Sequence, residues 1–347
     1  MKRNMLGNSD LEVTDLCLGS MTWGTQTPEA GGHAQIDRAL DAGINFIDTA
    51  EMYPVNPVRD ETVGLTEQII GNWIGRTGRR NDFVLATKMS GAGRASVRGG
   101  RGIQPGDLEE ALDGSLKRLQ TDMIDIYQFH WPNRGSYHFR QNWSYDPSGQ
   151  NRAQTEDHMV AVLEKLAEMR AKGKIRHFGL SNETAWGTCE WLRLARLTGA
   201  PEVISIQNEY SLLCRLYDTD LAELSVNENV GLLAFSPLGA GLLSGKYQNG
   251  AIPDGSRRAI SEGIGGRWGD RTAVAVDAYL AVARKHDLDP VQMALAWCCT
   301  RPFMGSAIFG ATTMDQLDHI LAGKDLVLSD DVLTDITETH KAHPMPY

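Results

Sequence analysis

Residues 124–130, Ile-Asp-Ile-Tyr-Gln-Phe-His, form a short run of β-branched and apolar residues, as is typical of a buried strand. The next periodic segment, Met159–Ala171, has apolar side chains at helical spacing, and Gly173 follows it as a left-handed cap. A second strand-like run, His177–Ser181, comes directly afterwards. This order predicts two parallel strands joined by a helix.

The same alternation extends along the whole chain. Eight strand-like runs are predicted, at Leu16–Trp23, Ile44–Thr49, Phe83–Lys88, Ile124–His130, His177–Ser181, Val203–Gln207, Gly231–Phe235 and Ser306–Gly310. Helical segments are predicted at Ala34–Ala42, Val63–Arg76, Leu108–Leu119, Met159–Ala171, Ala185–Thr198, Leu221–Glu228, Ala273–His286, Val291–Thr300 and Gln316–Leu321. Such a chain forms a parallel sheet covered by helices.

Two arrangements of this sheet compete, an open doubly wound sheet and a closed barrel. A doubly wound nucleotide-binding sheet should carry G-x-G-x-x-G after its first strand. Neither Met21–Thr25, after the first run, nor the glycine-rich stretch Gly239–Gly245 has that spacing. We therefore predict a single domain over residues 1–347, an α/β protein with a (β/α)8 TIM barrel. We also expect an extra C-terminal helix and an N-terminal β-hairpin at Leu6–Leu11 that closes the lower end.

Composition narrows the range of partners. Lys and Arg number 34 and Asp and Glu 44, so the net charge of −10 argues against a nucleic-acid partner. No apolar run is long enough to span a membrane, and Met1–Gly7 does not resemble a signal peptide. The five cysteines lack C-x-x-C spacing and the histidines lack metal-binding spacing, so we expect a cytoplasmic protein with no metal. The oligomeric state is not predicted.

Polar residues end three neighbouring strands. Chemistry in a (β/α)8 barrel gathers at the carboxyl ends of the strands, where Asp48, Lys88 and His130 fall. Tyr53 lies in the loop just after Asp48. Each residue alone could be a solvated or structural side chain, but together they place an acid, an ammonium, an imidazole and a phenol at one mouth.

These four groups suggest one kind of reaction. A phenol, with a pKa of about 10, is a weak acid, and a nearby ammonium such as Lys88 lowers that value. Asp48 can hold Lys88 charged and oriented, while His130 can hydrogen-bond a carbonyl oxygen. No Ser or Cys with its own base is apparent, so covalent acyl transfer is not indicated. The set can donate a proton to a carbonyl oxygen and needs a hydride from elsewhere.

Three segments carry a family resemblance: Asp48-Thr49-Ala50-Glu51-Met52-Tyr53, Ala86-Thr87-Lys88 and Gln128-Phe129-His130-Trp131-Pro132. They resemble the signatures of the aldo-keto reductases. The bacterial Tas-type and potassium-channel β-subunit-like branches are the most similar, by Ser181-Asn182-Glu183-Thr184-Ala185, Gly310-Ala311-Thr312-Thr313-Met314 and the long loop after His130. The resemblance implies a catalytic tetrad of Asp48, Tyr53, Lys88 and His130, with Tyr53 as general acid. It also implies NADPH as cofactor and a small-molecule aldehyde or ketone as substrate.

The resemblance also implies where the cofactor binds. The nicotinamide amide would meet Ser181 and Asn182 of a G-x-S-N segment together with Gln207, and Phe235 would stack on its ring. The remaining contacts are implied for the pyrophosphate side at Ser236, Pro237, Leu238, Gly241 and Ser244, for the 2′-phosphate at Lys246 and Arg257, and for the adenosine end at Gly310, Thr312 and Gln316.

Two loops and two alternative functions stay open. The aromatic segment Trp131–Thr155 is either a lid over the carbonyl pocket or a set of rings packed on helices, and Trp131 and Trp23 are predicted to line that pocket. Ser90–Gly106 is predicted to be a flexible, solvated flap whose arginines could attract an anion. The alternatives to a reductase are a regulatory, redox-sensing module that holds NADPH with slow turnover and a metal-assisted hydrolase.

Overall fold

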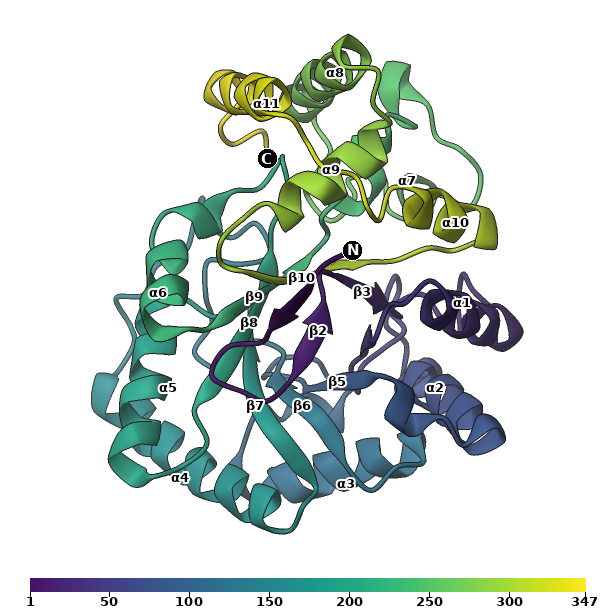
Figure 1. Ribbon diagram of the computed structural model, residues 1–347. Coiled ribbons are helices and arrows are strands. Elements are labelled where there is room, and N and C mark those ends of the chain that lie inside the picture. Colours follow the sequence, from purple (N-terminus) through teal and green to yellow (C-terminus); the bar gives the residue numbers. More distant parts are fainter.

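The computed structural model describes residues 1–347 and contains a closed barrel of eight parallel strands surrounded by helices (Figure 1). The barrel strands are β3 (Leu16–Gly19), β4 (Phe46–Asp48), β5 (Val84–Met89), β6 (Ile124–Phe129), β7 (Ile175–Ser181), β8 (Val203–Glu209), β9 (Gly231–Phe235) and β10 (Met304–Phe309). They follow one another around the barrel in chain order, and β10 pairs with β3 to close it. The predicted (β/α)8 barrel is therefore confirmed.

Eleven α-helices accompany the strands. They are α1 (Glu29–Asp41), α2 (Leu65–Thr77), α3 (Leu108–Leu119), α4 (Arg152–Ala171), α5 (Ala185–Thr198), α6 (Leu221–Glu228), α7 (Arg257–Ile260), α8 (Asp270–Lys285), α9 (Pro290–Cys299), α10 (Met314–Ala322) and α11 (Asp330–Ala342). Helices α1 to α6 surround the barrel, while α8 and α11 lie together at the top of the view (Figure 1). Helix α11 is the expected extra C-terminal helix. No helix of the chain is both long and apolar enough to cross a membrane.

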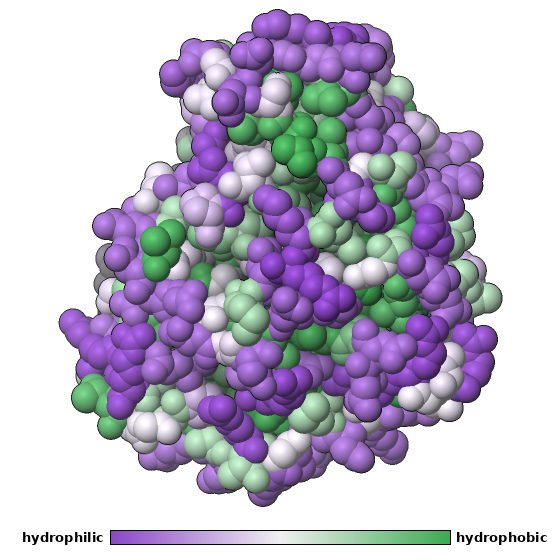
Figure 2. Space-filling model, in the orientation of Figure 1, coloured by the Kyte–Doolittle hydropathy of each residue, from purple (hydrophilic) through white to green (hydrophobic).

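The N-terminal hairpin closes one end of the barrel. Strands β1 (Arg3–Met5) and β2 (Glu12–Thr14) pair antiparallel, and the Leu6 amide donates to the Leu11 carbonyl at 2.9 Å. Leu6, Leu11 and Val13 are buried in an apolar cluster with side chains from the barrel interior. Burying a leucine stabilises a fold by about 1.5–3 kcal/mol, so the plug contributes to stability as well as to closure. The hairpin crosses the near end of the barrel in Figure 1, on a face that is mainly hydrophilic in Figure 2.

The first barrel strand and the helix after it differ from the prediction. Strand β3 ends at Gly19 and not at Trp23, because residues 20–25 turn back toward the next helix. Helix α1 begins five residues earlier than expected, and its first turn includes Gly32. A Cβ at Gly32 would lie 3.1 Å from the Trp23 ring, so glycine lets the helix approach this tryptophan closely.

The long segment after β6 is also shorter than predicted. Helix α4 begins at Arg152, seven residues before the apolar periodicity becomes visible, because the Asn151 side chain caps it and accepts from the Gln154 amide at 3.1 Å. The loop between His130 and this helix therefore ends at Asn151, and Gln154 and Thr155 belong to the helix.

Candidate active site

The strand periodicity explains why polar side chains meet inside the mouth of the barrel. Side chains two positions apart on a strand share a face. Three apolar residues lie in the interior cluster beneath the mouth: Phe46, Ala86 and Ile126. Each precedes a polar residue by two positions, and these are Asp48, Lys88 and Gln128. The alternation thus places an apolar layer at the plugged end and a polar layer at the open end.

Lys88 and Asp48 form a buried ion pair. The Lys88 ammonium donates to Asp48 Oδ2 at 2.6 Å and to the Thr49 carbonyl at 2.7 Å, and the lysine is fully buried. Burial alone would lower the pKa of Lys88, but Asp48 and Tyr53 more than offset this and raise it. The ammonium therefore stays charged in the closed interior, as predicted from the sequence.

Two glutamines complete the environment of Asp48. Gln207 Nε2 donates to Asp48 Oδ1 at 2.8 Å and Gln128 Nε2 does so at 3.2 Å. The sequence interpretation did not include Gln128, although its inward position on β6, two residues after Ile126, was available as a signal. It assigned Gln207 to the cofactor amide, whereas the structure directs the Gln207 amide toward the ion pair.

Tyr53 lies beside the ion pair and His130. The Lys88 ammonium is 4.9 Å from the centroid of the Tyr53 ring, and the His130 ring centroid is 5.7 Å away. Burial raises the pKa of Tyr53, while Lys88 opposes this rise. The predicted lowering of the Tyr53 pKa by Lys88 is present, but desolvation outweighs it, so the pKa is raised overall. The phenol is protonated at neutral pH and can act as a proton donor.

His130 is a neutral imidazole. Burial is the main cause that holds its pKa well below 6.5, and the positive charges of Lys88 and Arg94 add to the effect. The Nδ1 atom of His130 is buried without a hydrogen-bond partner. The other ring nitrogen, Nε2, makes no hydrogen bond and is not enclosed, so it can hydrogen-bond a small molecule that enters the mouth.

The lowered pKa of His130 predicts a loss of stability in acid. Below pH 6.5 the unfolded chain binds a proton at this histidine that the folded chain does not, so the free energy of unfolding should fall with decreasing pH. The slope contributed by one such group reaches about 1.4 kcal/mol per pH unit. The free energy of unfolding, measured with urea at several pH values between 7.5 and 5, should depend less steeply on pH in His130→Gln than in the unchanged protein. The same pH dependence in the variant and the unchanged protein would contradict this assignment. Some pH dependence should remain in the variant, because burial also lowers the pKa of His138.

Ser181 ends β7 and Asn182 follows it, next to the tetrad. Asn182 Nδ2 donates to the His130 carbonyl at 2.9 Å, and Ser181 Oγ donates to the Gln207 carbonyl at 2.7 Å. Asn182 Oδ1 is buried without a partner. This free acceptor fits the carboxamide NH2 of a nicotinamide, so the residues present are suited to the implied cofactor.

The segment after β9 has a backbone suited to a close ligand. Phe235 ends the strand with a partly exposed ring, and Ser236, Pro237 and Leu238 lead into a short 3-10 segment, η6 (Gly239–Ser244). Gly241 has φ +92°, and a Cβ there would lie 3.1 Å from Lys246 Cε. Glycine is therefore needed for this loop, in which Ser244 Oγ donates to the Gly241 carbonyl at 2.8 Å.

Two cations beside this loop have no acidic partner. Lys246 is exposed with its ammonium 5.2 Å from the Tyr247 ring centroid, and it forms no salt bridge. Arg257 forms none either, and burial together with repulsion from Arg267 lowers its pKa. Tyr247, which the sequence interpretation missed, has a buried hydroxyl without a partner. An anion with several oxygens would satisfy all three groups.

The segment after β10 is exposed at Gly310 and Gln316. Thr313 caps α10 by accepting from the Gln316 amide at 3.3 Å. The Gln316 side chain does not complete a capping box with Thr313, because its Oε1 accepts from the backbone amide and hydroxyl of Thr312 instead. These bonds join Thr312 and Gln316 at the start of the helix.

The two tryptophans predicted to line the pocket lie in different places. Trp131 lies against His130, with ring centroids 5.0 Å apart and ring planes tilted by 49°, and its indole donates to the Ala92 carbonyl at 3.0 Å. Trp23 is fully buried and donates to Gln35 on α1 at 3.0 Å. The structure therefore supports a pocket position for Trp131 only. Trp23 is a core residue because β3 ends before it.

The loop over residues 131–151 is docked on the mouth. Ser136 Oγ donates to the Asn182 carbonyl at 2.9 Å, and Arg134 Nη1 donates to Glu183 at 3.0 Å. His138 and Asn208 both contact the Glu183 carbonyl. These polar contacts, which no sequence pattern indicates, hold the lid beside Ser181 and Asn182.

The predicted flap at 90–106 contacts the barrel mouth through one arginine and is braced internally by another. Arg98 forms a salt bridge with buried Glu51 at 3.0 Å and donates to the Ser90 carbonyl at 2.8 Å. Arg101 pairs with Asp107 at 2.7 Å. Two of the three arginines of this segment therefore have carboxylate partners, while Arg94 is exposed and forms no salt bridge. The flexibility of the segment stays a prediction.

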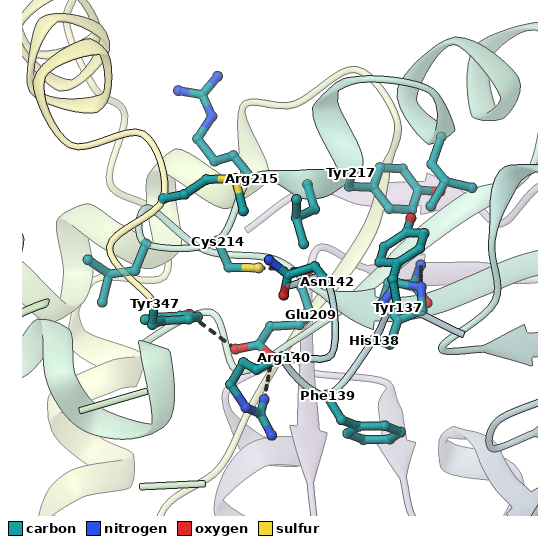
Figure 3. Close-up of a pocket in the computed structure, with 15 residues that line it drawn as sticks. Tyr137, His138, Phe139, Arg140, Asn142, Glu209, Cys214, Arg215, Tyr217 and Tyr347 are labelled. Carbon is teal, nitrogen blue, oxygen red and sulfur yellow. Dashed lines mark hydrogen bonds and ion pairs between the residues drawn. The ribbon is translucent and has the colours of Figure 1, made fainter. Parts of the chain in front are cut away.

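A cavity lies near this mouth, between the lid, the end of β8 and the C-terminal residues (Figure 3). It holds none of the tetrad residues. The tetrad itself lies where β4, β5 and β6 end, above a plugged barrel. A (β/α)8 barrel with this proton-donating set and a free amide acceptor beside it defines a class of oxidoreductase.

Comparisons with known proteins agree with this class. The model of the "Aldo/keto reductase family" matches residues 15–341. The chain is 46% identical to "Protein tas" of Escherichia coli (strain K12), over 100% of this chain and 99% of the relative. It is 30% identical to "Uncharacterized oxidoreductase YrpG" of Bacillus subtilis (strain 168), over 96% and 94%. It is 28% identical to "Probable voltage-gated potassium channel subunit beta" of Arabidopsis thaliana, over 99% and 98%.

The chain belongs to the aldo/keto reductase family. The resemblance stated from the sequence motifs is thereby confirmed, including its branches. Membership supports an oxidoreductase that acts on a small molecule, and the family generally uses NAD(P)H.

Proposed function

We propose that this protein reduces aldehydes or ketones to alcohols with NADPH, and that Tyr53 is the general acid. The observation that carries the proposal is the contact of the protonated Tyr53 phenol with the buried Lys88–Asp48 pair. A structural ion pair alone would not require a phenol beside it at the open end of the barrel. The free Asn182 acceptor supports a nicotinamide as the neighbouring group.

Each residue has a defined task in this reaction. The cofactor, when bound, would supply a hydride. His130, neutral and with a free nitrogen, orients the carbonyl oxygen by a hydrogen bond. Tyr53 donates its proton to that oxygen as negative charge develops there, and Lys88 stabilises the phenolate that remains. Asp48 holds Lys88 in place, while Trp131 and the docked lid limit access of water.

Isotope transfer tests the proposal directly. NADPH that carries deuterium at C4 should be oxidised in many turnovers with aldehydes such as 4-nitrobenzaldehyde, and mass spectrometry should find deuterium on the alcohol carbon. Oxidation of less than one equivalent of bound cofactor would instead favour the NADPH-holding regulatory module. Loss of turnover with a chelator would favour a metal-assisted reaction, although no cluster of metal-binding side chains is present.

The choice of NADPH over NADH rests on Lys246 and Arg257. A charge-assisted hydrogen bond contributes about 1.5–3 kcal/mol, so the double variant Lys246→Ala/Arg257→Ala should weaken NADPH binding by about 10²-fold or more. NADH lacks the 2′-phosphate, so its Kd should change little. Fluorescence titration of both cofactors measures the effect. Equal losses for NADPH and NADH would contradict the assignment.

Arg258 offers a matched control for this experiment. It adjoins Arg257, but its guanidinium lies 4.0 Å from the centre of the Trp268 ring and donates to the Ala251 carbonyl. Arg258→Ala should therefore leave the ratio of the two Kd values close to that of the unchanged protein. The cytoplasmic location and the lack of nucleic-acid and membrane partners remain predictions.

A further inference from the structure

Glu209 is a buried carboxylate outside the tetrad. It ends β8, two residues after the Gln207 that contacts Asp48, and only 8% of its surface is exposed. The proton donation described above does not use it. A carboxylate in such a place is costly unless several donors surround it.

Three segments that are far apart in the sequence supply those donors. Arg267 Nε donates to Glu209 Oε1 at 2.6 Å, and Arg140 Nη1 donates to Oε2 at 2.9 Å. The Tyr347 hydroxyl donates to Oε1 at 3.1 Å. Figure 3 shows Arg140 and Tyr347 reaching Glu209 from separate parts of the chain.

The charges around Glu209 favour its ionised form. Burial alone would raise the pKa of Glu209, but Arg267, Arg140 and Tyr347 more than offset it and lower the pKa. The two arginines depend on this carboxylate in turn, because Arg267 and Arg140 repel one another and both are largely buried. Removing the charge leaves two guanidinium groups side by side without an acid.

The tethered segments follow different strands, β6 and β9, and they meet where the Arg140 side chain lies next to Gly265 and Gly266. Arg140 is part of the lid, which also holds the Asn182 carbonyl through Ser136. Arg267 lies in the irregular segment that follows α7, the helix that begins with Arg257. It donates to the Ile264 carbonyl of the same segment at 3.2 Å. One carboxylate thus joins the side that covers the substrate pocket to the side that carries a free cation for the cofactor.

We infer that Glu209 is a positioning residue that couples the lid at 131–151 to the segment at 257–269, so that either side is held in place only while the other is. The identity of the two ligands rests on the proposed function, whereas the coupling between the two segments does not depend on it. Arg267 and Arg140 transmit the constraint, and Tyr347 adds the C-terminal residues to it.

Hydrogen exchange of the protein without cofactor tests the coupling. Arg267→Met should speed amide exchange in residues 136–145, and Arg140→Met should speed amide exchange in residues 257–269. In each case the faster exchange is expected in the segment that does not contain the substituted arginine. Glu209→Gln should speed both. If each arginine variant affects only its own segment, the coupling is overturned. These outcomes do not depend on turnover, so a failure of the proposed reaction would be seen separately.

Asp125 provides the matched control. It is a buried carboxylate held by Arg80 at 2.8 Å and Arg176 at 2.9 Å, at the plugged end of the barrel. Asp125→Asn should lower the melting temperature without faster exchange in either segment at the mouth. The same pattern in Glu209→Gln would show a merely structural role and overturn the inference.

Ligand binding gives a second measurement. Glu209→Gln should raise both the Kd of NADPH and the KM of the aldehyde by about tenfold, within the usual range of coupling between sites, and change kcat much less. Arg140→Met and Arg267→Met should each raise both the KM of the aldehyde and the Kd of NADPH, because loss of either arginine releases both segments. A Glu209→Gln variant with unchanged Kd and KM would contradict the positioning role.

Discussion

Replacing Tyr53 by phenylalanine should lower kcat for aldehyde reduction by about 10²–10⁴-fold, the usual contribution of a positioned general acid. The change removes one oxygen and keeps the ring, so the contact with His130 at 5.7 Å and the nearby Lys88 should persist. The Kd of NADPH should stay within about twofold, because the hydroxyl serves the substrate oxygen. Single-turnover experiments measure the chemical step as the oxidation of bound NADPH at 340 nm. In the unchanged protein this oxidation should take on the order of seconds or less.

Tyr127 offers a matched control for this substitution. It lies on β6 close to the same mouth, is fully buried, and has a hydroxyl without a hydrogen-bond partner. Its side chain faces the helices, since it alternates with the inward-pointing Gln128. Tyr127→Phe should therefore keep nearly full activity. Equal rates in Tyr53→Phe and the unchanged protein would remove the basis of the proposed reaction.

Replacing Lys88 by methionine should have the largest effect on stability. The substitution keeps much of the side-chain volume but leaves Asp48 buried without its counter-ion, which typically costs about 3–5 kcal/mol. Activity should fall as well, because the phenolate of Tyr53 loses its stabilising charge. Urea unfolding at pH 7.5 measures the first effect, and steady-state turnover measures the second.

The double variant Asp48→Asn/Lys88→Met separates these two effects. Without the buried charge, the free energy of unfolding should recover a large part of the loss, since a neutral amide can still accept from Gln128 and Gln207. Turnover should not recover, because the ammonium is still absent. A stability change below about 1 kcal/mol in Lys88→Met would show that the ion pair is not strongly coupled to folding.

The repeated strand and helix patterns were sufficient to predict the barrel, because period-2 and period-3.6 hydrophobicity record which faces are buried. The residues at strand ends, such as Asp48 and Lys88, could be placed at one mouth because parallel strands in a barrel all point the same way. Their contact at 2.6 Å agrees with that expectation. The N-terminal hairpin was visible from its turn residues.

Other features depend on contacts that have no period in the sequence. The position of Trp23 follows from a chain reversal at residues 20–25, and the net rise in the pKa of Tyr53 follows from how deeply the phenol is enclosed. Arg98 and Glu51 meet across two loops, so this contact could not be inferred from either loop alone. Glu209 is likewise joined to partners 58, 69 and 138 residues away.

The pairing of β10 with β3 has a consequence for how the chain is made. The first barrel strand, β3, leaves the ribosome early, and residues 16–18 find their partners, residues 307–309, only when almost the entire polypeptide has been synthesised. Translation adds about 5–20 residues per second, so the edge of β3 stays unpaired for tens of seconds. During translation the β3 edge of the nascent protein therefore stays unpaired until β10 has been synthesised.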